Sequence, residues 1–494
     1  MKVNKQITAL VCAFILSVSA LQSTRAQDKL DRTKIPPPGK TPVLQVPTWT
    51  KTTLSNGATF IVSERTGLPL VSFSITFLGG ANQFESADRR GTASFTASML
   101  TEGTTTKTGD ELSDALQLLG SNIGANVGSE EGSIGFVSTT RNFQGTLSIL
   151  ADMMLNPTFP AEALERLRGR TLVGLTQQKD QPTVVGGQVF AKILYGSGHP
   201  YGQRTTEATV KAITRDDIVA FHKAYFQPGR AIITVVGDVK AAQVKSMVEK
   251  TLAGWAKAGD KPSFDYPKLP EKRPATIYLV DKPGAAQSVV NIGIPGPPRN
   301  TPDFFALQVL NMILGGHFQS RLNANIREEK GYSYGVNSAF AYGKGPGPFR
   351  AGGSVFSDKT DAALIEFMKE LKGIVGARPV TDEELKMAKD QLIQSLPQRF
   401  SSVSTIGSTI TNLTVQGLPE NYYQNYEKAV SAVTREDLTR VANLYIDIDH
   451  LAIVIVGDRS AVEGKLKAAN IAPITILDSE GNPIGSSAAA KPGN

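Results

Sequence analysis

The chain has 494 residues, of which 40% are hydrophobic and 20% are charged. These values are typical of a globular protein with two to four domains. Removing Lys2, Lys5 and Arg25, which lie in an N-terminal targeting segment, leaves 49 basic against 45 acidic side chains, a mild net charge of +4. There is no basic run with interleaved aromatic residues, so nothing indicates nucleic-acid binding. Cys12 is the only cysteine and lies in the same segment, which excludes disulfides and cysteine-based sites from the mature chain.

Residues 1–26 have the features of a secretory signal peptide. The start is positively charged, the stretch 7–21 is mostly apolar, and the small residue Ala26 precedes Gln27 at a plausible cleavage point. The apolar stretch is shorter than the roughly 20 residues that span a bilayer, and no later stretch approaches that length. We therefore expect an exported protein, periplasmic or extracellular, with no transmembrane segment in the mature chain.

The elements that follow alternate between strands and helices. Residues 27–50 form a Pro-rich extended arm, and Asn56-Gly57 then marks a hairpin turn. Further strands are expected at 70–77 and in the stretches SNIGANV and GSIGFVS. Helices are predicted from apolar periodicity and capping residues at 91–104, 109–120, 141–155 and 160–178, and in a segment that begins at Thr214.

Part of this pattern occurs twice. The stretch from Ala212 to Asp238 shares nine residues with the stretch from Ala432 to Asp458, at a constant offset of 220 and without gaps. The helix openings FPAEALERL and VTDEELKMA also correspond, at an offset of 221. A repeat of this length indicates duplicated domains rather than a series of short repeats.

The predicted fold is therefore α+β, with two homologous duplicated domains. In chain order the predicted parts are a signal peptide (1–26), the arm (27–50), a first domain (51–255), a polar linker (256–274), a second domain (275–478) and a flexible tail (479–494).

The stretch GTASFTASMLTEGT, residues 91–104, carries the most informative pattern. Read as a helix, it places Ser94, Ala97 and Ser98 on one face at i, i+3 and i+4. This is the spacing of the H-x-x-E-H motif, in which two His and a Glu converge on a metal ion.

The surrounding residues resemble the insulinase/pitrilysin family of zinc peptidases, the inverzincins, which typically read G-x-A-H-F-L-E-H-M-L-F-x-G-T. Ser94 and Ser98 stand where that family has its His ligands, and Ala97 stands where it has the general-base Glu. The positions that fit the family frame are Gly91, Ala93, Phe95, Met99, Leu100, Gly103 and Thr104.

The family's third zinc ligand is a Glu roughly 76 residues beyond the second His. Counting from Ser98 leads to Gly174, and no Asp or Glu lies between Glu165 and Asp180. Zinc needs three or four nitrogen, sulfur or oxygen ligands, which this set does not supply. The resemblance therefore implies a non-catalytic member of the family that binds no metal cofactor itself.

Other catalytic sites find no support. The four histidines (His199, His222, His317 and His450) are scattered, and His199 is interpreted as structural. No credible Ser-His-Asp set is present. The glycine-rich stretch 343–347 lacks the context of a nucleotide-binding loop and is predicted to be a hairpin loop.

The second domain keeps a different part of the family pattern. The stretch LGGHFQSRLNANIREEKGYSYGVNSAF contains Arg327 and Tyr334, seven residues apart. In the family an Arg and a Tyr with this spacing face the zinc site from the opposite half of a clamshell and hold the substrate. One departure is Lys330, where the family has a second Arg.

The resemblance implies two homologous domains, each with a mostly antiparallel sheet packed against helices, which together form half of such a clamshell. The first hypothesis is a non-catalytic subunit that supplies Arg327 and Tyr334 to a homologous zinc peptidase with an intact H-x-x-E-H, acting on peptides or unfolded polypeptides. The alternative is a structural pseudoenzyme, a scaffold in a cell-envelope complex. An enzyme with unrelated chemistry has no support among these residues. Zinc is expected only in the partner.

Overall fold

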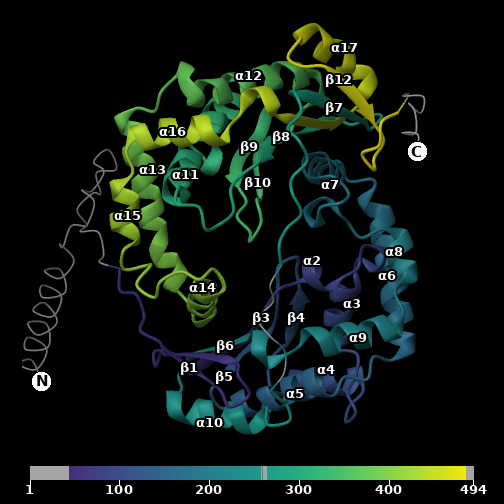
Figure 1. The fold of residues 1–494 in the computed structure, drawn as a ribbon, viewed down its shortest axis with the longest axis vertical. Helices are drawn as coiled ribbons and strands as arrows, with labels where there is room; N and C mark the ends of the chain where they lie inside the picture. Colours follow the sequence, from purple (N-terminus) through teal and green to yellow (C-terminus); the bar gives the residue numbers. More distant parts are fainter. Residues whose placement is uncertain (1–43, 258, 260–263, 485–494) are drawn as a thin grey trace, which may run out of the picture. The chain divides into compact units, whose positions relative to one another are not determined.

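The structure is a computed structural model that describes residues 44–257, 259 and 264–484. The predicted signal peptide, most of the arm, part of the linker and the end of the tail lie outside these residues. The described residues from Val46 onward belong to one compact unit, which contains two six-stranded sheets (Figure 1).

The first sheet begins with the predicted hairpin, in which Gly57 adopts a φ of 92° at the turn. Such a left-handed conformation suits glycine because it has no Cβ. All neighbouring strands are antiparallel except β2 and β6, which are parallel. The strands, in spatial order, are β1 (Thr50–Thr53), β2 (Thr59–Glu64), β6 (Ala231–Gly237), β3 (Leu70–Leu78), β5 (Glu131–Thr139) and β4 (Gly124–Val127).

The second sheet repeats this arrangement except at one edge, where the edge strand is parallel to its neighbour, whereas β1 is antiparallel to β2. One further pair of neighbouring strands is parallel, and the remaining three pairs are antiparallel. The prediction of two duplicated domains, each with a mostly antiparallel sheet, is therefore confirmed. The strands, in spatial order, are β12 (Ile474–Leu477), β7 (Thr276–Asp281), β11 (Ala452–Gly457), β8 (Gln287–Pro295), β10 (Pro348–Phe356) and β9 (Ser333–Phe340).

Several helices begin at a residue whose side chain caps them. Thr214 and Thr434, which correspond in the repeat, both form capping boxes, with Asp217 and Asp437. The first half contains α2 (Ala81–Phe84), α3 (Thr92–Met99), α4 (Gly109–Leu118), α5 (Phe143–Leu155), α6 (Ala161–Gln178), α7 (Pro182–Tyr195), α8 (Glu207–Ala212), α9 (Arg215–Tyr225) and α10 (Ala241–Thr251). The second half contains α11 (Phe304–Asn311), α12 (Thr360–Lys372), α13 (Asp382–Ser395), α14 (Val403–Val415), α15 (Tyr426–Ala432), α16 (Arg435–Tyr445) and α17 (Arg459–Ala469), with π-helical turns at η4 (Met312–Gly316), η5 (Asn323–Glu329) and η7 (Gly373–Ala377).

Each sheet buries one face against helices of its own half. In β3 the side chains alternate strictly, so that Phe73, Ile75 and Phe77 enter the core beneath α5 and α9. The intervening Ser72, Ser74 and Thr76 point to the opposite face of the sheet. The two faces of the first sheet therefore differ in character, one apolar and one partly polar.

The second faces are covered by an exchange of helices between the two halves. The helix α7 lies within the predicted first domain, yet it packs on β8 and β11 of the second sheet. Conversely, α14 from the second half packs on β3 and β6 of the first sheet. The turn at 478–484 also contacts α7, because Lys192 donates to the Glu480 carbonyl oxygen and to Asn482. Boundaries drawn along the sequence do not capture this exchange.

A buried pair of hydroxyl groups joins α14 to the first sheet. Thr411 Oγ1 and Thr234 Oγ1 are 2.6 Å apart, and the two residues are 5% and 1% exposed. They lie next to an apolar cluster in which Ile406 and Ile410 contact Ile232 and Val236. Apolar burial therefore holds the helix, and the hydroxyl pair satisfies the polar groups that the contact buries.

This pair yields a stability prediction. Thr411→Val keeps the shape but leaves the Thr234 hydroxyl buried without a partner, which should lower the free energy of unfolding by roughly 1–3 kcal/mol. The double variant Thr234→Val/Thr411→Val removes both polar groups and should recover most of that loss. Urea unfolding of the three proteins measures the difference. Equal stability of the single and double variants would contradict this account.

Candidate functional site

The helix α3 is held at its N-terminus by a buried carboxylate. Glu85 accepts hydrogen bonds from the backbone nitrogens of Gly91 (3.1 Å) and Ala93 (2.6 Å), and Arg90 Nη1 lies 3.4 Å from its Oε2. Burial raises the pKa of Glu85, while the two amides and Arg90 lower it. The carboxylate therefore satisfies amides that would otherwise be unpaired at the helix start.

The structure places the first three predicted positions on α3 with different exposures. Ser94 and Ser98 are exposed, whereas Ala97 is 3% exposed and belongs to the core. Ser94 Oγ donates to the carbonyl oxygen of Gly91 at 2.9 Å. The side chains on this face are thus a hydroxyl bonded to its own helix, a hydroxyl that has no hydrogen-bond partner among the described residues, and a methyl group.

Gly174 lies on α6, which packs against α3. A Cβ built at Gly174 would meet no atom within 4 Å, so the space for a side chain is present but empty. On the same helix Arg166 and Arg170 approach Glu102 at 3.0 and 4.0 Å. Across the described part of the chain, no group of three or more His, Cys, Asp or Glu is arranged to hold a metal ion. The residues at these positions do not fit zinc.

Arg327 and Tyr334 lie on adjoining elements of the second domain. Arg327 belongs to η5, where its guanidinium lies 4.1 Å above the ring of Phe318 and 3.1 Å from Glu328 Oε1. Tyr334 belongs to β9, at the edge of the second sheet, and packs edge-on against Phe356 at 5.7 Å. Between residues 44 and 484, the described part of the chain offers the Tyr334 hydroxyl no hydrogen-bond partner. Tyr334 is 80% exposed and Phe318 is 60% exposed.

Sequence reasoning did not find Phe318 or Phe356. Phe318 lies within the family-like stretch, but a single Phe carries no signal of exposure. The structure adds that each predicted residue is paired with an aromatic ring, Arg327 with Phe318 and Tyr334 with Phe356. The assignment of the pair to substrate binding remains a prediction.

The glycine-rich stretch 343–347 is a loop that joins β9 to β10, as predicted. It is anchored to the first half of the chain by Glu130, which accepts from the Lys344 backbone nitrogen at 2.8 Å and from two tyrosine hydroxyls, Tyr201 and Tyr266. The ring of His199 stacks on Tyr266 at 5.6 Å, and His199 is 2% exposed. Its structural role is therefore supported.

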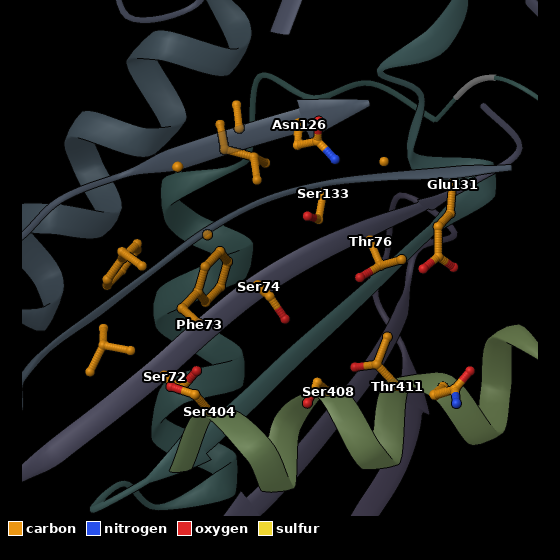
Figure 2. A pocket seen from close by; sticks show the side chains of 18 of the residues that line it. Ser72, Phe73, Ser74, Thr76, Asn126, Glu131, Ser133, Ser404, Ser408 and Thr411 are labelled. Atoms are coloured by element: carbon orange, nitrogen blue, oxygen red, sulfur yellow. The ribbon is translucent and has the colours of Figure 1, made fainter. Parts of the chain in front are cut away.

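A groove of about 890 Å³ lies between the open face of the first sheet and α14 (Figure 2). Most of its labelled side chains carry hydroxyl groups. They come from β3 and β5 on one side and α14 on the other, segments more than 260 residues apart. No local pattern could have indicated this groove, because the exchange of helices creates it.

Two family profiles match the chain. The profile described as Insulinase (Peptidase family M16) matches residues 61–197, and the profile described as Peptidase M16 inactive domain matches residues 212–392. Together they cover more than half of the sequence. The chain belongs to the insulinase family, M16. The family resemblance found in the sequence is therefore confirmed.

Among similar proteins, some are named as peptidases and one is named as a non-peptidase. It is 24% identical over 355 residues to the "uncharacterized zinc protease YmxG" of Bacillus subtilis, covering 72% of this chain and 85% of that protein. It is 22% identical over 404 residues to the "non-peptidase homolog YmxG" of Helicobacter pylori, covering 81% and 91%. The crystal structure of a peptidase M16 inactive domain from Pseudomonas fluorescens has 25% identity and a TM-score of 0.75, covering 83% of this chain and 98% of that one.

A crystal structure of a protease from Helicobacter pylori shows the same fold, with a TM-score of 0.76 at 19% identity over 84% of this chain and 100% of that one. The M16 fold is thus present along nearly the whole described chain. The positions that the sequence pattern predicts to correspond to the family's zinc ligands hold Ser94, Ser98 and Gly174. The chain is an inactive, peptidase-like member of M16.

The missing ligands yield a prediction on metal binding. The purified protein should retain no stoichiometric zinc after metal stripping and repletion, because two hydroxyls and a glycine are too weak a ligand set. The variant Ser94→His/Ser98→His/Gly174→Glu should bind close to one zinc per chain, since two of these positions are exposed and the third has room for a side chain. Elemental analysis of both proteins measures this. One tightly held zinc in the unmodified chain would refute the prediction.

Proposed function

We propose that this chain is the non-catalytic subunit of an exported insulinase-like zinc peptidase. It would supply Arg327 and Tyr334 to the zinc site of a homologous partner that keeps an intact H-x-x-E-H, and zinc would reside in that partner. The substrate would be a peptide or an unfolded polypeptide. The observation that carries this proposal is the contrast between Ser94, Ser98 and Gly174 at the predicted zinc-ligand positions and Tyr334, which is 80% exposed on a sheet edge.

The chemistry of the two side chains suits this role. A phenol held by a rigid strand can donate a hydrogen bond to the oxyanion that develops when a peptide carbonyl is attacked. Arg327 offers a planar fork of donors for a peptide carbonyl or carboxylate. Its stacking on Phe318 restricts the guanidinium to one surface, so less conformational freedom is lost when substrate binds.

The surroundings of the pair also favour a macromolecular partner. Phe318 and Tyr334 are large side chains that water largely surrounds in this chain. Aromatic and arginine side chains are enriched in protein–protein interfaces, where they dominate the binding energy. A partner that covers this surface would remove both rings from water and place the Tyr334 hydroxyl in a dry site.

The kinetic prediction follows from these roles. In the co-purified complex, Tyr334→Phe should lower kcat/KM roughly 10- to 1,000-fold, the range expected when one oxyanion donor is lost. Arg327→Ala should act mainly by raising KM, because it removes a contact to the ground-state peptide. Steady-state cleavage of a quenched peptide measures both effects.

The control is assembly of each variant with the partner, followed by size-exclusion chromatography. Tyr334→Phe removes one hydroxyl and little packing, so the complex should form normally. A scaffold would need neither side chain for chemistry. Full activity of both variants in an intact complex would therefore favour the scaffold and leave the composite site without support.

The proposed location rests on the N-terminal sequence. Within residues 44–257, 259 and 264–484, no helix combines the length and apolar character needed to cross a membrane. We expect cleavage of the signal near Ala26, so that the mature protein begins near Gln27. Fractionation with N-terminal sequencing measures this, and a mature cytoplasmic protein that still begins with Met1 would contradict it.

A further inference from the structure

The groove between the first sheet and α14 has the length of a short peptide. Its floor is formed by β3 and β5, and the lining residues of β5 run from Glu131 to Val137. Six steps along a strand span about 20 Å. The volume of about 890 Å³ lies in the range of ligand-binding pockets. The groove can therefore hold about six residues of an extended chain.

The spacing of its hydroxyl groups matches that of an extended main chain. On β3, Ser72, Ser74 and Thr76 alternate with core residues, so neighbouring hydroxyls lie about 6.8 Å apart. On the facing wall, Ser404 and Ser408 are one helical turn apart, about 6 Å. Backbone N–H and C=O groups on one side of an extended peptide also recur about every 6.8 Å. Each hydroxyl can donate or accept, so both kinds of backbone group find a partner.

Several hydroxyl groups on the floor of the groove, including that of Thr76, have no hydrogen-bond partner among the described residues. Thr76 is only 8% exposed, and Figure 2 shows its side chain pointing into the groove. Among the described residues its hydroxyl has no hydrogen-bond partner, and the same holds for the hydroxyls of Ser72, Ser74 and Ser133. A polar group so placed is left to water or to a ligand that enters the groove.

In the second domain, a long side chain occupies the place that corresponds to the groove of the first domain. Ser74 lies opposite Gly135 and Thr234, just as Asn291 lies opposite Gly352 and Val454. Thr234 and Val454 are related by the repeat offset of 220.

Two residues further along these strands, Ser133 lies opposite Thr76 in the first sheet. At the corresponding place in the second sheet, Arg350 lies opposite Gly293. The Arg350 guanidinium lies across the second sheet and donates to Asn291 and Asn337. The fold therefore accommodates a long side chain here, and the first domain leaves the space open.

The lining excludes several other ligand classes. Glu131 and Arg399 are its charged residues and have opposite signs, so the groove offers no net charge to an anion or a polyanion. Phe73 and Phe136 line it but are 1% and 5% exposed, because their rings belong to the core beneath the sheet. No aromatic face is available for stacking a base or another flat ring. The remaining lining consists mainly of small hydroxyl side chains and glycines, with two asparagines and a few aliphatic residues, which favours a narrow main chain over a bulky ligand.

We propose that this groove binds an extended peptide through its main chain, on the face of the first sheet, with little dependence on side-chain sequence. The proposal rests on the proposed function, because it assigns the chain a polypeptide substrate. It adds a site within this chain alone, on the other sheet from Arg327 and Tyr334. The peptide would lie across strand side chains, which differs from the addition of a strand to a sheet edge.

The test uses the isolated full chain and a fluorescein-labelled, unstructured ten-residue peptide of Gly, Ser, Ala and Val with blocked ends. Fluorescence anisotropy should show saturable binding. Ser133→Arg, which copies the filled state of the second domain, should weaken binding at least tenfold, and Thr76→Val should weaken it about threefold or more. The matched control is Ser148→Arg, which adds the same charge at an exposed position on α5 and should change the affinity less than twofold.

Circular dichroism and urea unfolding of each variant check that the fold is retained. The proposal that the groove binds a peptide would be wrong if Ser133→Arg left the peptide affinity unchanged. It would also be wrong if the unmodified chain bound no peptide at millimolar concentration. Displacement of the peptide by maltoheptaose would contradict it as well, because it would assign the site to carbohydrate. A loss of affinity in Arg327→Ala but not in Ser133→Arg would place the peptide at the Arg327 pair, which overturns the groove and supports the proposed function.

Discussion

The exchange of α7 and α14 is the contact on which the rest of the structure depends. Each sheet carries apolar side chains on both faces, and the helices of its own half cover only one of these faces. The second face of the first sheet would expose Ile61, Ile232 and Val236 if α14 were absent. Because α14 is narrower than the sheet, it covers β6 and part of β3 and leaves β5 and β4 open. The groove is the direct result of this mismatch in width.

The three positions predicted to have lost zinc ligands lie where a substitution requires little structural change. Ser94 and Ser98 are exposed, and Gly174 faces open space, so none of the three supports the core. Glu85 still anchors the start of α3 through backbone amides, and this contact is independent of any metal. Frame residues such as Phe95 and Met99 pack in the core, whereas the predicted ligand positions do not. Selection on folding alone would preserve the first and ignore the second.

The sequence was informative wherever a local rule governs structure. The hairpin at Asn56-Gly57, the capping boxes at Thr214 and Thr434 and the alternation in β3 are each set by a few adjacent residues, and the structure agrees with them. The duplication was visible because both copies keep the same caps. The partners of α7 and α14 could not be predicted, since an apolar helix face does not specify which sheet it covers. For the same reason the pairing of Arg327 with Phe318, and the groove beside α14, appear only in three dimensions.

The exchange of helices bears on how such a chain could arise. A single domain of this type would carry a helix whose apolar face fits a sheet that the domain itself does not provide. Two identical copies could satisfy each other by trading that helix around a twofold axis, as in a domain-swapped dimer. Joining the two copies by a linker would fix that dimer within one polypeptide. The present chain would then be a fused homodimer whose halves have since diverged. The first half has a groove at the place where the second half has Arg350.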